Sequence, residues 1–301
     1  MKYALQIKNL SKSYKNSKAV DNLNLNVPEG KIYGFLGRNG AGKTTTIRMI
    51  TGLIKPDSGE IKVLDKDVHK NRLWGSQNIG SIIETPGFYE CLTAYENLAI
   101  TAELFNVKKN RITEVLDIVN LSGCESKKAG QFSLGMKQRL GIANALLHSP
   151  KILILDEPTN GLDPEGIRDM RDFLRILSEE HGVTIMLSSH ILNEVQQIAD
   201  FVGIIDHGKL IEEVDILSIN EDNQSCLLLE VDDDKKAIGI IKDLGYKYQA
   251  EPDSIKVFCK KSLNNILNKK LVDAQIKVNN LSSVAQSLEE RFLAVISEKN
   301  C

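Results

Sequence analysis

The chain has 301 residues, of which 42% are hydrophobic and 26% charged, which predicts a globular protein with more than one small core. Its 38 Lys and Arg residues nearly balance 40 Asp and Glu residues, giving a formal net charge of −2. This balance argues against nucleic acid or an anionic membrane surface as the main partner, so we expect no nucleic-acid partner.

The cysteines and the N-terminus both favour a cytoplasmic protein. The five cysteines are odd in number and contain no C-x-x-C pair, which argues against zinc sites and disulfide frameworks. The first residues lack the apolar stretch of a signal peptide. No uninterrupted apolar run approaches the roughly 18–20 residues that a membrane helix needs. If the protein works at a membrane, other chains must span it.

The N-terminal part, residues 1–217, alternates short apolar strands with longer amphipathic stretches, as α/β domains do. We expect strands at residues 31–36, 151–155 and 183–187, the first running through a glycine-rich turn into a helix from about Lys43. Short, mostly apolar strands favour a parallel sheet covered on both faces. Ligands of such sheets bind at the carboxyl ends of the strands, and polar residues follow all three strands.

A helical insertion is expected within this core, at about residues 93–147. Residues 93–104 and 112–119 carry apolar side chains at three- to four-residue spacing, and residues 132–147 follow a serine suited to cap a helix.

A polar stretch at residues 218–224 predicts a linker to a C-terminal domain, residues 225–301. There we expect extended segments at 226–231, 246–249, 255–258 and 275–278, and helices at 235–244, 263–271 and 284–296. The alternation predicts a small α+β domain. The C-terminal domain contains no chemical motif. The sequence therefore leaves open whether this domain senses a ligand or acts as a dimer brace.

The sharpest motif is GRNGAGKT, which matches G-x-x-x-x-G-K-[ST] between an expected strand and an expected helix. Glycines let the backbone wrap phosphates with N–H groups pointing inward, and the following helix N-terminus adds partial positive charge. In such a loop Lys43 bridges the β- and γ-phosphates and the Thr44 hydroxyl ligates Mg²⁺. The predicted phosphate-binding residues, including Thr45 at the α-phosphate, are Gly37, Arg38, Asn39, Gly40, Ala41, Gly42, Lys43, Thr44 and Thr45.

Two other strand ends carry residues suited to hydrolysis. One apolar strand delivers Asp156, placed to orient the Mg²⁺ shell, and Glu157, placed to polarise the attacking water. His190 follows another apolar strand and fits a sensor of the γ-phosphate. The predicted catalytic residues are therefore Glu157, His190 and Lys43.

The segment FSLGMKQR, residues 132–139, resembles the signature motif (LSGGQ and variants) of the ABC transporter ATPases. It stands between the phosphate loop and the acidic strand, in the family's order. Leu134 and Met136 depart from the commonest form. Ser133 and Gly135, which carry most of the phosphate contact in the family, are kept.

Other positions match family elements in order. Residues 161–163, GLD, resemble the D-loop and add Asp163 to the nucleotide-binding candidates. Tyr14 stands where the family's aromatic residue stacks on adenine, and Val20 is expected to complete that pocket. The resemblance covers residues 1 to about 215.

The resemblance implies a P-loop NTPase core of the ABC ATPase type, with ATP and Mg²⁺ as cofactors. It also implies two copies packed head to tail, a homodimer by default because both half-sites look complete. Each ATP would be held by one copy and capped by Ser133 and Gly135 of the other, so that ATP closes the dimer and hydrolysis opens it. A membrane permease is the implied partner, which would place the chain on the inner face of the membrane, with the helical insertion as the contact.

Glu84 departs from the pattern of the ABC transporter ATPases, because most of the family has Gln at this position. A Glu still reaches Mg²⁺ or its water, but it adds negative charge near the γ-phosphate. IETPGFY at residues 83–89, followed by LTAYENL at 92–98, resembles the branch that handles bacitracin and lantibiotic peptides. Glu84 therefore joins Thr44 and Asp156 as a metal candidate, and the chain is expected to power export or removal of an antimicrobial peptide.

Two alternatives stay open. One is an exporter ATPase for sodium, a drug or a polysaccharide, since substrate is chosen in membrane subunits. The other is a soluble ABC ATPase acting on ribosomes or DNA, although such proteins usually carry two cassettes, a coiled-coil insertion or a basic face.

Overall fold

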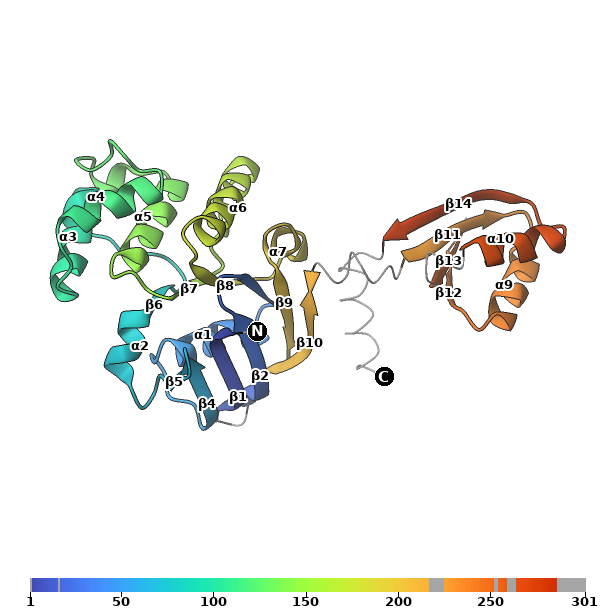
Figure 1. Ribbon diagram of the computed structural model, residues 1–301, viewed down its shortest axis with the longest axis horizontal. Helices are drawn as coiled ribbons and strands as arrows, with labels where there is room; N and C mark the ends of the chain where they lie inside the picture. Colours follow the sequence, from blue (N-terminus) through green and yellow to red (C-terminus); the bar gives the residue numbers. More distant parts are fainter. Residues whose placement is uncertain (1, 16, 217–224, 252–253, 259–263, 286–301) are drawn as a thin grey trace. The chain divides into compact units, whose positions relative to one another are not determined.

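The computed structural model describes residues 2–15, 17–216, 225–251, 254–258 and 264–285. The chain divides into two compact units, residues 1–215 and 216–301 (Figure 1). The linker predicted at residues 218–224 lies outside the described residues.

A six-stranded sheet forms the centre of the first unit, in the order β10-β9-β3-β8-β7-β6. All neighbours from β9 to β6 are parallel, and β10 is antiparallel to β9. Every residue of β3, β7 and β8 is buried, which confirms the covered parallel sheet expected from the sequence. The bounds are β3 Ile32–Leu36, β6 Ile79–Ile82, β7 Ile152–Asp156, β8 Thr184–Ser189, β9 Phe201–Asp206 and β10 Lys209–Asp215.

A second sheet, of four antiparallel strands in the order β2-β1-β4-β5, was not expected from the sequence. It shares a buried core with helix α1 (Lys43–Ile50) and one face of the central sheet, so α1 lies between the two sheets (Figure 1). The second sheet and α1 thereby cover one face of the central sheet. Its strands are β1 Tyr3–Tyr14, β2 Ser17–Pro28, β4 Ser58–Val63 and β5 Lys66–Asp67.

Helices α6 (Pro164–Glu179) and α7 (Leu192–Ile198) cover the other face of the central sheet, and α2 (Arg72–Asn78) precedes β6 (Figure 1). Helix α7 packs directly on β3 at Gly34, where an added Cβ would lie 2.1 Å from Val195 Cγ1. Only glycine allows α7 to approach β3 this closely. The contact holds α7, which follows β8 in the chain, against β3.

The helical insertion contains α3 (Ala94–Leu104), α4 (Asn110–Ile118), the short 3₁₀ helix η1 (Ala129–Gln131) and α5 (Leu134–Leu146). These agree closely with the expected helices. Thr93 begins α3 with a capping box, its hydroxyl accepting from Glu96 N–H while the Glu96 carboxylate accepts from Thr93 N–H. Ser133 caps α5, as predicted.

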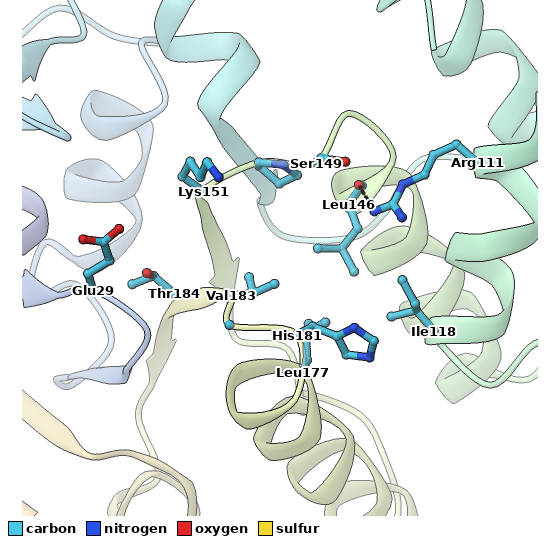
Figure 2. A pocket seen from close by; sticks show the side chains of 12 residues that line it. Glu29, Arg111, Ile118, Leu146, Ser149, Lys151, Leu177, His181, Val183 and Thr184 are labelled. Carbon is cyan, nitrogen blue, oxygen red and sulfur yellow. Dashed lines mark hydrogen bonds between the residues drawn. The ribbon is translucent and has the colours of Figure 1, made fainter. Parts of the chain in front are cut away.

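A pocket of about 370 Å³ lies where this insertion meets the amino ends of β7 and β8 (Figure 2). Two cations line it: Arg111, which donates to Leu146 O at 3.4 Å and pairs with Glu114, and Lys151; His181 also lies in the lining. Helices α5 and α6 both end here, and helix C-termini carry partial negative charge. The cations thus complement the fold itself, and the pocket lies at the opposite end of the strands from the predicted site.

The second unit is a four-stranded antiparallel sheet, β12-β13-β11-β14, with two helices. Alternate residues Leu227, Leu229, Ile255 and Val257 face both helices in one core. The chain order is βαββαβ, a split βαβ arrangement. The elements are β11 Ser225–Val231, α9 Asp234–Asp243, β12 Lys247–Ala250, β13 Ile255–Phe258, α10 Asn264–Asp273 and β14 Val278–Ala285.

The last strand corrects the sequence expectation. Residues 275–277 are not in a strand, because Gln275 takes a left-handed φ of 60° and residues 274–276 bond back onto α10. The strand begins at Val278 and pairs with β11 as far as Ala285. The helix predicted at 284–296 is therefore wrong at its first two residues, and its remainder lies outside the described residues. Within the described ranges, no helix combines the length and apolar character needed to span a bilayer.

Candidate nucleotide site

A pocket of about 470 Å³ lies where the carboxyl ends of β3, β7 and β8 meet. It brings the phosphate loop together with Glu157 and His190, three segments far apart in the sequence. Ala19 and Asn160 also line the pocket and were not among the residues predicted from the sequence. The lining residues are Ala19, Arg38, Asn39, Gly40, Gly42, Lys43, Thr44, Thr45, Glu157, Asn160 and His190.

The phosphate loop owes its shape to glycines that admit close backbone contacts. Gly42 has a φ of 107°, and an added Cβ would lie 2.4 Å from Ala19 O. At Gly37 an added Cβ would lie 2.5 Å from Ile205 O. The loop then enters α1, whose N-terminus has no side-chain cap and no acidic residue in its first turn. Uncapped N–H groups at a helix start form a ready site for phosphate.

Lys43 lies inside this loop, with only 6% of its surface exposed. Its ammonium donates to Gly37 O at 2.6 Å and to Arg38 O at 3.3 Å. It also lies 3.3 Å from Glu157 Oε1. The cation is therefore held where phosphates would enter, by partners that phosphate oxygens can replace.

Glu157 links the other two predicted catalytic residues, Lys43 and His190, through its carboxylate. One carboxylate oxygen faces Lys43, and the other lies 2.8 Å from His190 Nδ1. Its backbone takes a φ of 51°, a left-handed conformation that costs a non-glycine residue of order 1–3 kcal/mol. Strain of this kind is found where surrounding contacts fix a functional side chain.

Asp156 lies beneath the pocket at the end of β7, with 3% of its surface exposed. Its Oδ1 accepts from Ser188 Oγ at 2.5 Å, and the same hydroxyl accepts from Glu157 N–H at 3.0 Å. Ser188 is not among the site residues predicted from the sequence. The signal was available in principle, since adjacent parallel strands bring their ends together.

The predicted metal ligands differ in where they lie. Thr44 lines the pocket and Asp156 underlies it. Mg²⁺ typically takes one or two protein oxygens together with phosphates and waters, and these two residues fit that donor set. Accordingly, no cluster of three or more His, Cys, Asp or Glu with metal-binding geometry occurs in the part of the chain that the structure describes.

Glu84 is not in the pocket lining. Its side chain is 65% exposed and pairs with Arg48 of α1. Like Glu157, it has a left-handed backbone, with a φ of 64°.

The predicted adenine contacts also lie outside the pocket lining. Tyr14 ends β1 with 48% of its surface exposed, and Lys12 Nζ lies 5.8 Å from its ring centre. Val20 is fully buried in the core between the sheets, while its neighbour Ala19 lines the pocket. Tyr14 is thus accessible to a base, whereas the Val20 side chain packs in the interior.

Ser133, Gly135 and Asp163 gather at a separate place. Ser133 caps α5 by accepting from Met136 N–H at 3.3 Å, and Asp163 caps α6 by accepting from Gly166 N–H at 2.9 Å. An added Cβ on Gly135 would lie 3.8 Å from Leu162, so the signature segment lies beside the D-loop. None of the three lines the phosphate pocket. The predicted nucleotide-binding residues therefore do not all meet in one place within a single chain.

Comparison with known proteins decides the family. The ABC transporter family model matches residues 20–160. The bacitracin transport ATP-binding protein BcrA of Bacillus licheniformis is 48% identical over 98% of both chains. This chain belongs to the ABC transporter ATP-binding proteins. The lantibiotic transport ATP-binding protein SrtF of Streptococcus pyogenes is 47% identical over 69% of this chain and 90% of its own.

A solved structure of an ABC cassette agrees with the fold. The dimeric, post-hydrolysis cassette MJ0796, bound to ADP and Pi, is 27% identical and superposes with a TM-score of 0.63, covering 70% of this chain and 98% of its own. The predicted P-loop ABC core and the resemblance to the bacitracin and lantibiotic branch are confirmed. The chain is an ATP-binding and ATP-hydrolysing transporter subunit.

Proposed function

We propose that this ABC subunit powers the export or removal of a bacitracin- or lantibiotic-type peptide through a separate membrane permease. The observation that carries the proposal is the 48% identity to a bacitracin transport ATP-binding protein along nearly the whole of both chains. The segments at residues 83–89 and 92–98, which include Glu84, support the same branch.

Nucleotide binding begins by exchanging the partners of Lys43. ATP phosphates take the places of Gly37 O, Arg38 O and the Glu157 carboxylate around the ammonium. The uncapped start of α1 supplies N–H donors, and Thr45 lines the same pocket for the α-phosphate. Tyr14 stacks on the base from its exposed position at the end of β1.

Magnesium would be held by the Thr44 hydroxyl and, through its water shell, by Asp156, and it would neutralise charge on the β- and γ-phosphates. Glu84 would join this shell after leaving Arg48. These assignments rest on oxygen donors at the pocket and beneath it.

Hydrolysis uses Glu157 as the base. Once phosphate replaces it at Lys43, the Glu157 carboxylate is free on one side to orient and deprotonate a water. His190 holds its other oxygen and reaches toward the γ-phosphate. The preorganised backbone of Glu157 limits the reorganisation that this step requires.

A second copy completes the site. Ser133 and Gly135 lie outside the phosphate pocket of their own chain, so they cap the nucleotide of the other copy, with Asp163 beside them. ATP closes this homodimer, and hydrolysis with product release opens it. The helical insertion transmits the motion to a permease, so the chain works in the cytoplasm at the inner face of the membrane.

A deletion strain tests the cargo. Loss of this chain is expected to raise susceptibility to bacitracin or a lantibiotic, measured as the minimal inhibitory concentration, without changing susceptibility to an unrelated ribosome-targeting drug. The wild-type chain should restore resistance, and Glu157→Gln should not. If the deletion strain became sensitive only to sodium, or to small drugs, the peptide proposal would be contradicted and one of the other exporter classes would be supported.

A further inference from the structure

Ser188 is a fully buried polar residue next to the acids of the site. It lies on β8, in register with Asp156 on β7 and with Phe35 on β3. A buried hydroxyl requires hydrogen-bond partners, and the identity of those partners shows what the hydroxyl holds in place.

The Ser188 hydroxyl uses both its donor and its acceptor capacity on two consecutive acidic residues. It donates to Asp156 Oδ1 at 2.5 Å and accepts from Glu157 N–H at 3.0 Å. By contrast, the buried Ser178 on α6 donates to a backbone carbonyl, Gly30 O, at 3.4 Å. Ser178 is therefore a reference for a buried serine that has no hydrogen bond to residues of the site.

The bond to Asp156 fixes the rotation of its carboxylate. Across the described ranges, Asp156 makes no other side-chain hydrogen bond, so Ser188 is the hydrogen-bond partner that holds the orientation of this carboxylate. A hydrogen bond to an ionised carboxylate is among the stronger ones in proteins.

The bond to Glu157 fixes a backbone that is under strain. Its φ of 51° aims the side chain at Lys43 and His190, and the Ser188 bond holds the N–H of that same residue. Without the hydroxyl, this peptide group loses its partner within the protein and is free to relax.

We propose that Ser188 is a positioning residue for ATP hydrolysis, whose single hydroxyl sets the Asp156 carboxylate and the Glu157 backbone relative to each other. The inference rests on the roles proposed above for these two acids. Ser188 does not line the phosphate pocket, so it acts on turnover and leaves nucleotide binding to the loop.

The test compares Ser188→Ala with Ser178→Ala in the full chain. Ser188→Ala is expected to lower kcat roughly 10- to 100-fold, the loss typical of a hydrogen bond to a charged group. Its KM for ATP, and its ATP affinity by calorimetry, should stay within about twofold of wild type. Ser178→Ala is expected to keep the wild-type kcat. Ser188→Thr, which keeps the hydroxyl, should recover most of the rate.

Several results would overturn the proposal: a Ser188→Ala kcat within about twofold of wild type, an equal loss in Ser178→Ala, or no recovery in a folded Ser188→Thr. If Ser188→Ala does not fold, Ser188→Cys, a weak donor of similar volume, takes its place with the same expectation. Measuring Glu157→Gln in parallel separates a failure of the proposed role of Glu157 from a failure of the positioning role of Ser188. If it turns over normally, the role of the acid is wrong. If it is inactive while Ser188→Ala is normal, only the positioning role fails.

Discussion

Glu157→Gln is expected to bind ATP normally, to lose turnover by roughly 10²- to 10⁴-fold, and to accumulate as an ATP-bound dimer. The amide keeps the size of the side chain and an oxygen that can face Lys43, but it cannot take a proton from water. It also removes a negative charge that lies 3.3 Å from the lysine that phosphates must reach. Binding is therefore preserved while the chemical step is lost.

Phosphate release and sedimentation velocity measure the two effects on the same sample. Glu179→Gln, at the exposed end of α6, is the matched control and should behave as wild type in both. If Glu157→Gln hydrolyses ATP at the wild-type rate, Glu157 is not the base. If it stays monomeric with ATP, nucleotide does not close the dimer.

Lys43→Ala is expected to lose ATP affinity by roughly 100-fold or more, since hydrogen bonds to charged groups each contribute about 1.5–3 kcal/mol. The ammonium is buried and aimed into the phosphate loop, and among the residues that the structure describes no other lysine lines the pocket. Its removal also leaves the Glu157 carboxylate facing incoming phosphate without the intervening cation.

Calorimetry with ATP measures this loss directly. Lys151→Ala, an exposed lysine at the amino end of the same sheet, carries the same charge change and should bind ATP as wild type does. Tight ATP binding by Lys43→Ala would show that another part of the chain holds the nucleotide.

The residues that meet in the pocket could be named from the sequence because they belong to local patterns. A glycine-rich turn between strand and helix, and two apolar strands ending in polar residues, are each readable within about ten residues. The parallel sheet then brings their ends together, which is why Lys43, Glu157 and His190 meet in one pocket.

Features that depend on pairing between distant segments escaped prediction. The antiparallel sheet of β1, β2 and β4 joins strands that lack a motif, and β14 is a strand because β11 pairs with it. Val20 was expected at the adenine but lies in the core, since its side chain points between the sheets while Ala19 faces the pocket. Ser188 gained its role only through register with Asp156.

The Glu84 segment shows a different limit of sequence reasoning. A motif names the residues that meet at one stage of a cycle, whereas the structure presents one arrangement, in which Glu84 pairs with Arg48. An exposed ion pair of this kind contributes about 0–1 kcal/mol, so little free energy opposes its exchange for another partner. The placement of Glu84 here is compatible with the role proposed for it after ATP binds.

Each ATP site is proposed to be built from two copies of the chain, and a mixture of two inactive variants tests this arrangement. Lys43→Ala disables the phosphate loop, and Ser133→Arg, at an exposed position, disables the signature segment. In a mixed dimer one site carries both defects and the other carries neither. An equal mixture is expected to recover ATPase activity, to as much as about a quarter of wild type for random pairing with independent sites. A mixture no more active than the two variants measured separately would contradict it.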